Sequence, residues 1–243
     1  MNYSIVTVTF NDFEGLRRTV DSIIGQTNND YEVIVIDGAS TCQQSIDFIM
    51  SLKGVERFRV ISEPDRGIYD AMNKGLRHVR GKYFIFMNSG DAFHSSHVLD
   101  NVAPYIADEV PLFFGQARIC SSQVKEGKLY PKNGINIDRW LSHSLPSHQA
   151  MFFRSDLFKD HKFNEDLKVS ADSVFKLFAL EHRWRYREIV ICDFYLGGLS
   201  SSNSIRSIYY QFKDRLKRSD RFGGLRNALF FLFKKSVKYL LRL

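Results

Sequence analysis

Short runs of β-branched and aromatic residues alternate with helix-like stretches through the first 90 residues of this chain. The strand-like runs are Ile5–Phe10, Val33–Ile36, Phe58–Ile61 and Tyr83–Met87. The stretches between them, at 13–25, 45–52 and 68–79, have the apolar spacing of amphipathic helices. Strand, covering helix and next strand form the repeating unit of a parallel sheet. We therefore predict an α/β fold with a mostly parallel central sheet flanked by helices, the first of them capped by Asn11.

The length of the chain predicts one main domain with an appendage. A chain of 243 residues with 44% hydrophobic content can bury one substantial core. We place the domain at 1–202, with a first half at 1–111 and a second half at 112–202, and a helical tail at 203–243. Further helices are expected at 137–142, 155–158 and 171–182.

The positive charge of the chain is concentrated in this tail. Asn203–Leu243 holds 11 Lys and Arg against two Asp and Glu, whereas Met1–Ser202 has a net charge of −2. This distribution argues against a nucleic-acid-binding fold, because the domain itself is slightly acidic. A helix after Gly223-Gly224 would place Leu225, Leu229 and Phe233 on one face and most of its Lys residues opposite. The tail could thus lie on an anionic membrane surface, or it could dock on the domain with a solvated basic face.

Polar residues cluster where each of the four predicted strands ends. They are Thr9 and Asn11, Asp37 and Gly38, Glu63 to Asp65, and Asn88 to Asp91. Ligands of open parallel sheets bind beyond the carboxyl ends of the strands. Four polar strand ends at one edge therefore predict a binding site.

The segment from Glu63 to Gly75 is the strongest local signal. Asp65 and Gly67 form a turn into a helix whose early positions carry Asp70, Asn73 and Lys74. Carboxylate, amide and ammonium groups within about one helical turn suit a ribose diphosphate. A solvated helix face would explain Asp70 and Asn73 without a ligand.

Several motifs, in this order, resemble glycosyltransferase family 2, and more narrowly the bacterial enzymes that build colanic acid and O-antigen units. They are the runs at 6–11, 35–40, 63–75 and 86–93 and the Leu-Pro-Ser-His-Gln-Ala run at 145–150. The resemblance covers about 5–200 and implies a GT-A fold that binds a nucleotide-diphosphate sugar, UDP- or GDP-linked. The donor-binding residues that it implies are Thr9, Phe10, Asn11, Asp37, Gly38, Asp65, Gly67, Asp70, Asn73, Lys74, Asn88 and Ser89. For Asp37, an Asx turn after the strand is the competing explanation.

The family's Asp-x-Asp metal motif is altered in this chain. Its two Asp positions hold Asn88 and Gly90, and one carboxylate, Asp91, follows immediately. The resemblance implies Mn²⁺ or Mg²⁺ bound through Asp91, since diphosphate and water can complete the shell of a hard cation. A turn or hydrogen-bonding role for Asp91 is the alternative.

The resemblance also implies a catalytic base and an acceptor loop. Asp172 matches the family's base, although Ala171 stands where a Glu commonly precedes it; a carboxylate early in a helix capped by Ser170 could also be structural. His148 and Gln149 would contact the diphosphate, the metal or the acceptor, unless His148 makes only a structural hydrogen bond. Gly198 and Ser200 would belong to a loop near the acceptor, or merely to a turn.

The expected function is that of an inverting, hexosyltransferase-type enzyme of bacterial surface polysaccharide synthesis. It would transfer a sugar to a hydroxyl of a lipid-diphosphate-linked glycan at the inner face of the cytoplasmic membrane, as a cytoplasmic, peripheral protein. This localisation follows from a chain that opens directly into a strand without a signal-like segment. The alternatives are a membrane-associated nucleotide-sugar-binding protein without transferase activity, and a sugar nucleotidylyltransferase, which would need a Gly-rich phosphate loop where Asn11 to Glu14 stand. The oligomeric state, the sugar and the linkage are left open.

Overall fold

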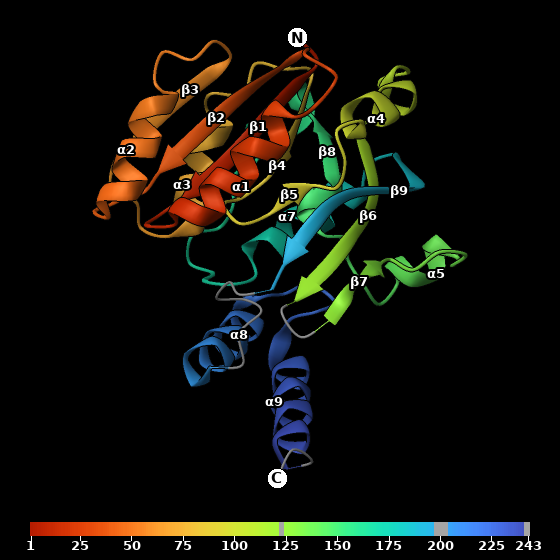
Figure 1. The fold of residues 1–243 in the computed structure, drawn as a ribbon. Coiled ribbons are helices and arrows are strands. Elements are labelled where there is room, and N and C mark those ends of the chain that lie inside the picture. Colours follow the sequence, from red (N-terminus) through yellow and green to blue (C-terminus); the bar gives the residue numbers. More distant parts are fainter. Residues whose placement is uncertain (122–123, 197–203, 241–243) are drawn as a thin grey trace.

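The computed structural model describes residues 1–121, 124–196 and 204–240, and within them nine strands form one mixed sheet (Figure 1). Its first half is parallel: β1 (Tyr3–Thr9), β2 (Tyr31–Asp37), β3 (Phe58–Ser62) and β4 (Tyr83–Phe86) lie in the order β3-β2-β1-β4. The connecting helices are α1 (Phe13–Ile24), α2 (Gln43–Leu52) and α3 (Ile68–Leu76). The predicted α/β architecture and the four predicted strands are confirmed.

The second half of the sheet is mixed in direction. It comprises β5 (Ala92–Phe93), β6 (Leu112–Ser121), β7 (Val124–Tyr130), β8 (Met151–Arg154) and β9 (Trp184–Tyr195). β8 is antiparallel to both β4 and β6, whereas β9 runs parallel to β6. The helical segments here are α4 (Val98–Ile106), α5 (Ile137–Leu141), the 3-10 turn η1 (His148–Ala150), α6 (Ser155–Phe158) and α7 (Ala171–Leu180).

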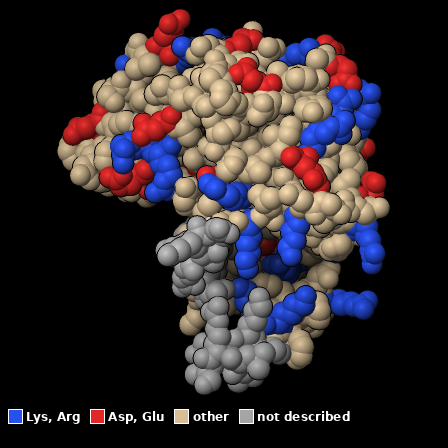
Figure 2. All heavy atoms as spheres, turned by 45° about the vertical axis from the view of Figure 1, so that its right-hand side comes forward, with Lys and Arg blue, Asp and Glu red and all other residues tan. Residues whose placement is uncertain are grey.

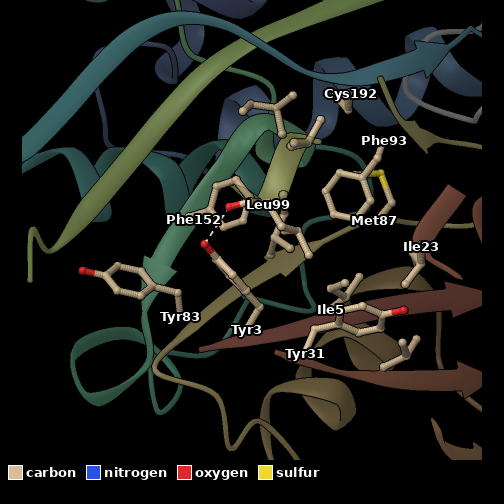
Figure 3. Close-up of a cluster of buried hydrophobic side chains, with 14 of the residues drawn as sticks. Tyr3, Ile5, Ile23, Tyr31, Tyr83, Met87, Phe93, Leu99, Phe152 and Cys192 are labelled. Atoms are coloured by element: carbon tan, nitrogen blue, oxygen red, sulfur yellow. Dashed lines mark hydrogen bonds between the residues drawn. The ribbon is translucent and has the colours of Figure 1, made fainter. Parts of the chain in front are cut away.

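The side chains of the central strands point alternately into two hydrophobic layers, one on each face of the sheet. Ile5 and Val33 pack with α1, α2 and α4 on one face, while Val6 and Ile34 pack with α3, α6 and α7 on the other. This follows from the alternation of side chains along a strand that is buried on both faces. Figure 3 shows the first layer, where the Tyr3 hydroxyl donates a 3.0 Å hydrogen bond to the Leu99 carbonyl.

The first helix begins at Phe13 as predicted, but its N-cap lies one residue later than predicted. Asp12 is its N-cap and accepts a hydrogen bond from the Gly15 amide, so the prediction of Asn11 as the cap is wrong. The Asn11 side chain instead accepts hydrogen bonds from the amides of Thr41 and Cys42. Asn11 has a positive φ of 52°, which turns its side chain toward this neighbouring loop.

The chain ends in two helices, α8 (Ile205–Lys217) and α9 (Gly224–Leu240), separated at the predicted glycine pair. Asp214 of α8 is 1% exposed and accepts hydrogen bonds from the Lys168 and Val169 amides and from the Ser170 hydroxyl. Ser170 is thus the N-cap residue of α7 by position only, because its hydroxyl bonds Asp214 and makes no capping bond. These bonds hold α8 against the start of α7, while α9 projects from the body of the protein (Figure 1).

Removing the Asp214 carboxylate should destabilise the whole fold. Asp214→Ala leaves the buried Val169 amide, the partly buried Lys168 amide and the buried Ser170 hydroxyl without their acceptor, so we expect the free energy of unfolding to fall by roughly 3 kcal/mol. Chemical denaturation of the full chain measures this loss. The matched control, Asp160→Ala at an exposed carboxylate, should change stability by less than about 0.5 kcal/mol. Equal stability of the two variants would show that Asp214 does not hold α8 in place.

Candidate active site

A cleft of about 750 Å³ lies beyond the carboxyl end of β4, between the start of α3, η1, α7 and α8. The predicted site residues that line it come from four separate segments of the sequence: Gly67, Asn88, Ser89, Asp91, His148, Gln149 and Asp172. The structure therefore brings the proposed metal, base and loop residues together around one space. Gly198 and Ser200 lie outside the described residues.

Asp172 is the centre of a polar cluster in this cleft. One of its oxygens accepts a 3.0 Å hydrogen bond from the Tyr69 hydroxyl, and the other lies 2.8 Å from the Lys176 ammonium. Nδ1 of His148 is 3.6 Å from that second oxygen. Lys176 follows Asp172 by one helical turn, so the geometry of α7 itself sets this ion pair.

These neighbours keep the Asp172 carboxyl group ionised. Burial alone would raise the pKa of Asp172, but the Lys176 ammonium and the His148 imidazole outweigh it and hold that pKa well below its usual range. Burial also raises the pKa of the Tyr69 phenol, which stays a hydrogen-bond donor to the carboxylate. The cleft thus holds a negative charge at one defined position.

His148 connects this cluster to the end of β4. Burial lowers the pKa of His148, more strongly than the Asp172 carboxylate raises it, so the imidazole is neutral near pH 7. Its Nε2 lies 3.3 Å from the Asn88 side-chain nitrogen. If Asn88 donates to Nε2, the proton of His148 is on Nδ1 and faces Asp172.

Asp91, like Asn88, is almost fully buried and lines the cleft. Its two oxygens accept hydrogen bonds from the Gln149 side chain (2.8 Å) and from the Tyr195 amide (3.2 Å). Burial raises the pKa of Asp91 to about 7, although these two hydrogen bonds act in the opposite direction. The site therefore holds Asp91 near the balance between its neutral and charged forms.

The oxygens around Asn88 and Asp91 fit a hard cation that receives most of its ligands from elsewhere. The Asn88 side-chain oxygen is buried and has no hydrogen-bond partner among the described residues. In the same part of the chain, no cluster of three His, Cys, Asp or Glu side chains could hold a metal ion by itself. An amide oxygen and one carboxylate suit Mg²⁺ or Mn²⁺ when diphosphate and water complete the coordination shell.

The ends of β1, β2 and β3 form a second part of the site, outside the cleft. Asp37 is buried and accepts hydrogen bonds from the Ser40 amide and hydroxyl and from the Ser62 hydroxyl. Its carboxylate therefore holds the loop after β2 in place, as the Asx-turn explanation requires. Thr9, paired with Asp37 in the sheet, is also buried.

The surface of this second part is made by Phe10, Gly38 and Asp65. The Phe10 ring is 59% exposed, and the Asp65 side chain lies so close over Gly38 that a Cβ there would collide with its carboxylate. The loop after β1 and the loop after β2 are linked by a 2.7 Å hydrogen bond from the Asn11 amide to the Ser40 hydroxyl. An exposed aromatic ring beside a carboxylate is suited to stacking and hydrogen bonding with a nucleoside.

The three polar residues of α3 face the protein interior. Lys74 is 7% exposed; its ammonium donates to the Pro64 carbonyl (2.6 Å) and pairs with Glu63 and Asp70. Asn73 exchanges hydrogen bonds with the Phe163 backbone through both ends of its amide. In this arrangement the side chains of Lys74 and Asn73 support the loops around the cleft and do not line it.

Sequence reasoning missed several residues that line the cleft. Lys176 could have been found from its spacing of four residues from Asp172, which is favourable for an ion pair on one helix. Tyr69 lies within a motif that was recognised, but only the fold brings it to Asp172. Arg206 and Tyr210 of α8 also line the cleft, and nothing in their local sequence indicates it.

Comparisons with known proteins identify the chain. The family model "Glycosyl transferase family 2" matches residues 4–183. A PGL/p-HBAD biosynthesis glycosyltransferase of Mycobacterium bovis is 30% identical over 230 residues, covering 91% of this chain and 86% of the relative.

Solved structures show the same fold at lower identity. TarS 1-349 of S. aureus in complex with UDP has a TM-score of 0.67 and 15% identity, covering 90% of this chain and 73% of that one. The mannosyltransferase PcManGT of Pyrobaculum calidifontis, in complex with GDP-Man and Mn²⁺, has a TM-score of 0.62 and 18% identity, with coverages of 87% and 60%. Since the family model spans well over half of the chain, this protein belongs to glycosyl transferase family 2 and is a glycosyltransferase with a GT-A fold.

Proposed function

We propose that this glycosyltransferase moves a sugar, with inversion, from a UDP- or GDP-linked donor to a hydroxyl of a lipid-diphosphate-linked glycan in bacterial surface polysaccharide synthesis. The observation that carries the proposal is the ionised Asp172 carboxylate, which lines the same cleft as Asn88 and Asp91, the polar residues that follow β4. An inverting transfer needs a proton acceptor on one side of the sugar and stabilisation of the leaving group on the other. The Asp172 carboxylate and a cation held by Asn88 and Asp91 would meet these two needs within one cleft.

In this proposal the donor lies across both parts of the site. The nucleoside contacts Phe10 and Asp65 at the sheet edge, and the diphosphate lies toward Gly67, Asn88 and Asp91. The nucleotide-sugar complexes of TarS and PcManGT support this half of the proposal, because their fold is the same. Asp37, Asp70, Asn73 and Lys74 act here by holding the donor loops in position.

Asp172 then accepts the proton of the attacking hydroxyl. Its low pKa makes it a weak base toward a free alcohol, but the hydroxyl becomes acidic as its oxygen bonds to the anomeric carbon, so the proton moves late in the step. Lys176 and Tyr69 fix the direction of the carboxylate. A bound Mg²⁺ or Mn²⁺, held by Asn88 and Asp91, would neutralise charge on the departing nucleoside diphosphate.

Replacing the base should abolish transfer without loss of donor binding. A thermal-shift panel of nucleotide sugars with Mn²⁺ first identifies the donor, since a bound ligand stabilises the fold by mass action. Asp172→Asn should then lower kcat by about 10³-fold while the donor affinity stays within about twofold. The control Asp166→Asn, at an exposed carboxylate of the preceding loop, should retain full turnover. Full turnover of Asp172→Asn would remove Asp172 from the mechanism, and donor binding without transfer in the unaltered chain would favour a binding protein.

Metal removal tests the proposed cation site at Asn88 and Asp91. We expect EDTA to stop transfer and Mn²⁺ to restore it, because the unpaired Asn88 side-chain oxygen and the Asp91 carboxylate would hold the cation that stabilises the leaving group. Asp91→Asn should raise the Mn²⁺ concentration needed for half-maximal rate by about tenfold. Titration of Mn²⁺ against initial rate measures both effects. Undiminished turnover in metal-free buffer would rule out the proposed metal role.

The proposed membrane contact, and with it a peripheral position at the cytoplasmic face, rests on α9. None of the described helices is long and apolar enough to span a bilayer. Leu225, Leu229, Phe230 and Phe233 are nevertheless all more than half exposed, and Figure 2 shows Lys and Arg side chains gathered beside the C-terminal helices. Exposed apolar side chains flanked by basic ones are typical of a helix lying in an anionic membrane interface.

Vesicle binding tests this contact without disturbing the cleft. Leu229→Gln with Phe233→Gln should weaken sedimentation with phosphatidylglycerol vesicles at least tenfold, because burying each side chain contributes about 2 kcal/mol. The matched control replaces two equally exposed apolar residues of the domain, Ile24→Gln with Met50→Gln, and should bind as the unaltered chain does. A truncation at Ser202 is unsuitable because it removes Asp214. Equal binding of the two double variants would refute the role of α9.

A further inference from the structure

A second cavity of about 420 Å³ adjoins the cleft on the side away from the nucleoside edge. Its walls come from the loop before η1, from α7 and from α8. Ser147, Ser173, Lys176 and Phe194 line both cavities. Because Ser173 directly follows Asp172 in α7, this cavity begins beside the catalytic carboxylate.

Several basic side chains line the second cavity. Lys176, Arg215, Arg218 and His143 line it, and no Asp or Glu is among its lining residues. Two of these cations are already neutralised by carboxylates that lie outside the cavity. Lys176 pairs with Asp172, and Arg218 makes a two-point ion pair with Asp220 at 2.7 and 2.8 Å.

Arg215 is different, because no carboxylate among the described residues pairs with it. Its guanidinium donates a 3.0 Å hydrogen bond to the Gln211 carbonyl and lies 4.1 Å over the Phe231 ring. These contacts orient the group but do not compensate its charge. Burial and the positive charge of Arg218 lower the pKa of Arg215, and the negative charge of Asp214 offsets them only in part. A half-buried cation without a paired carboxylate is costly, and a bound anion would relieve that cost.

We propose that this cavity binds a phosphate group of the acceptor, with Arg215 as its principal ligand. The proposal rests on the proposed transfer and adds the place at which a phosphate of its acceptor would bind. A guanidinium offers paired N–H donors that match phosphate oxygens, so an arginine suits this anion. The place of the cavity beside Asp172 assigns the phosphate to the acceptor, since the donor lies along the strand ends.

A third cavity adjoins the second one. It has about 570 Å³, shares Ile119 and Tyr130 with the second cavity, and is lined mainly by apolar groups that include Trp140 and Leu129. The three cavities thus order the acceptor: its hydroxyl at Asp172, its phosphate at Arg215 and an apolar portion at Trp140. This order matches a phosphate-linked lipid.

Inorganic phosphate is the probe for the second cavity. The full chain is first saturated with UDP or GDP, whichever stabilises it, so that phosphate cannot occupy the donor half. Calorimetric titration with phosphate should then show binding that Arg215→Gln weakens at least tenfold. Lys213→Gln, a charge loss at an exposed position on the same helix, should bind as the unaltered chain does. Nucleotide-induced stabilisation should be the same in all three proteins, so a failure of sugar transfer would leave this result standing.

Three results would overturn the proposal: equal phosphate affinity in Arg215→Gln, an equal loss in Lys213→Gln, or loss of nucleotide-induced stabilisation in a folded Arg215→Gln. A second measurement needs only the unaltered chain, in case Arg215→Gln does not fold. Phosphate should protect Arg215 from phenylglyoxal, as mapped by mass spectrometry, while the exposed Arg226 reacts fully. Equal reaction of Arg215 with and without phosphate would also exclude the subsite.

Discussion

The parallel register of the first four strands is the constraint on which the site depends. Thr9 pairs with Asp37 and Asp37 with Ser62, so the polar residues that end β1, β2 and β3 lie at one level of the sheet. β4 pairs in parallel with β1, so Asn88, which follows β4, lies at the same edge of the sheet. A shift of one residue in any of these strands would also turn its apolar side chains to the wrong layer. Core packing and site assembly are thus fixed by the same hydrogen-bond ladder.

The position of the Asp172 carboxylate in the cleft depends on a buried ion pair with Lys176. Asp172 and Lys176 would each be costly to bury alone, and their spacing on α7 makes each the compensation for the other. Tyr69 ties this pair to α3, and His148 ties it to the end of β4. The carboxylate therefore keeps its charge and its direction because three separate elements converge on it, which is what a positioned proton acceptor requires.

The sequence allowed prediction of those parts of the fold that local periodicity determines. Strands β1 to β4 and helices α1 to α3 follow from apolar spacing, and the cleft residues Asn88, Asp91, His148 and Asp172 follow from recognisable motifs. The antiparallel insertion of β8 between β4 and β6 could not be predicted, because it depends on contacts distant in sequence. The same applies to Asn73, whose amide is satisfied by the Phe163 backbone, 90 residues away. Asn11 was mistaken for a helix cap because Asn11 and Asp12 are both good capping residues, and only the backbone conformation distinguishes them.

The basic C-terminal segment divides into two parts with different physical roles. In α8, Asp214 fixes the helix to α7 and Arg206 lines the cleft, and just after the helix Arg218 pairs with Asp220. Much of the charge in this part is therefore engaged in contacts within the fold. In α9, by contrast, Leu229 and Phe233 are both more than half exposed. Because α8 is joined to α9 through a short turn and to α7, which carries Asp172, through Asp214, a surface that held α9 would also fix the direction in which the cleft opens. Under the proposed membrane contact, the excess of positive charge would therefore orient the enzyme toward a lipid-linked acceptor as well as attract it to the bilayer.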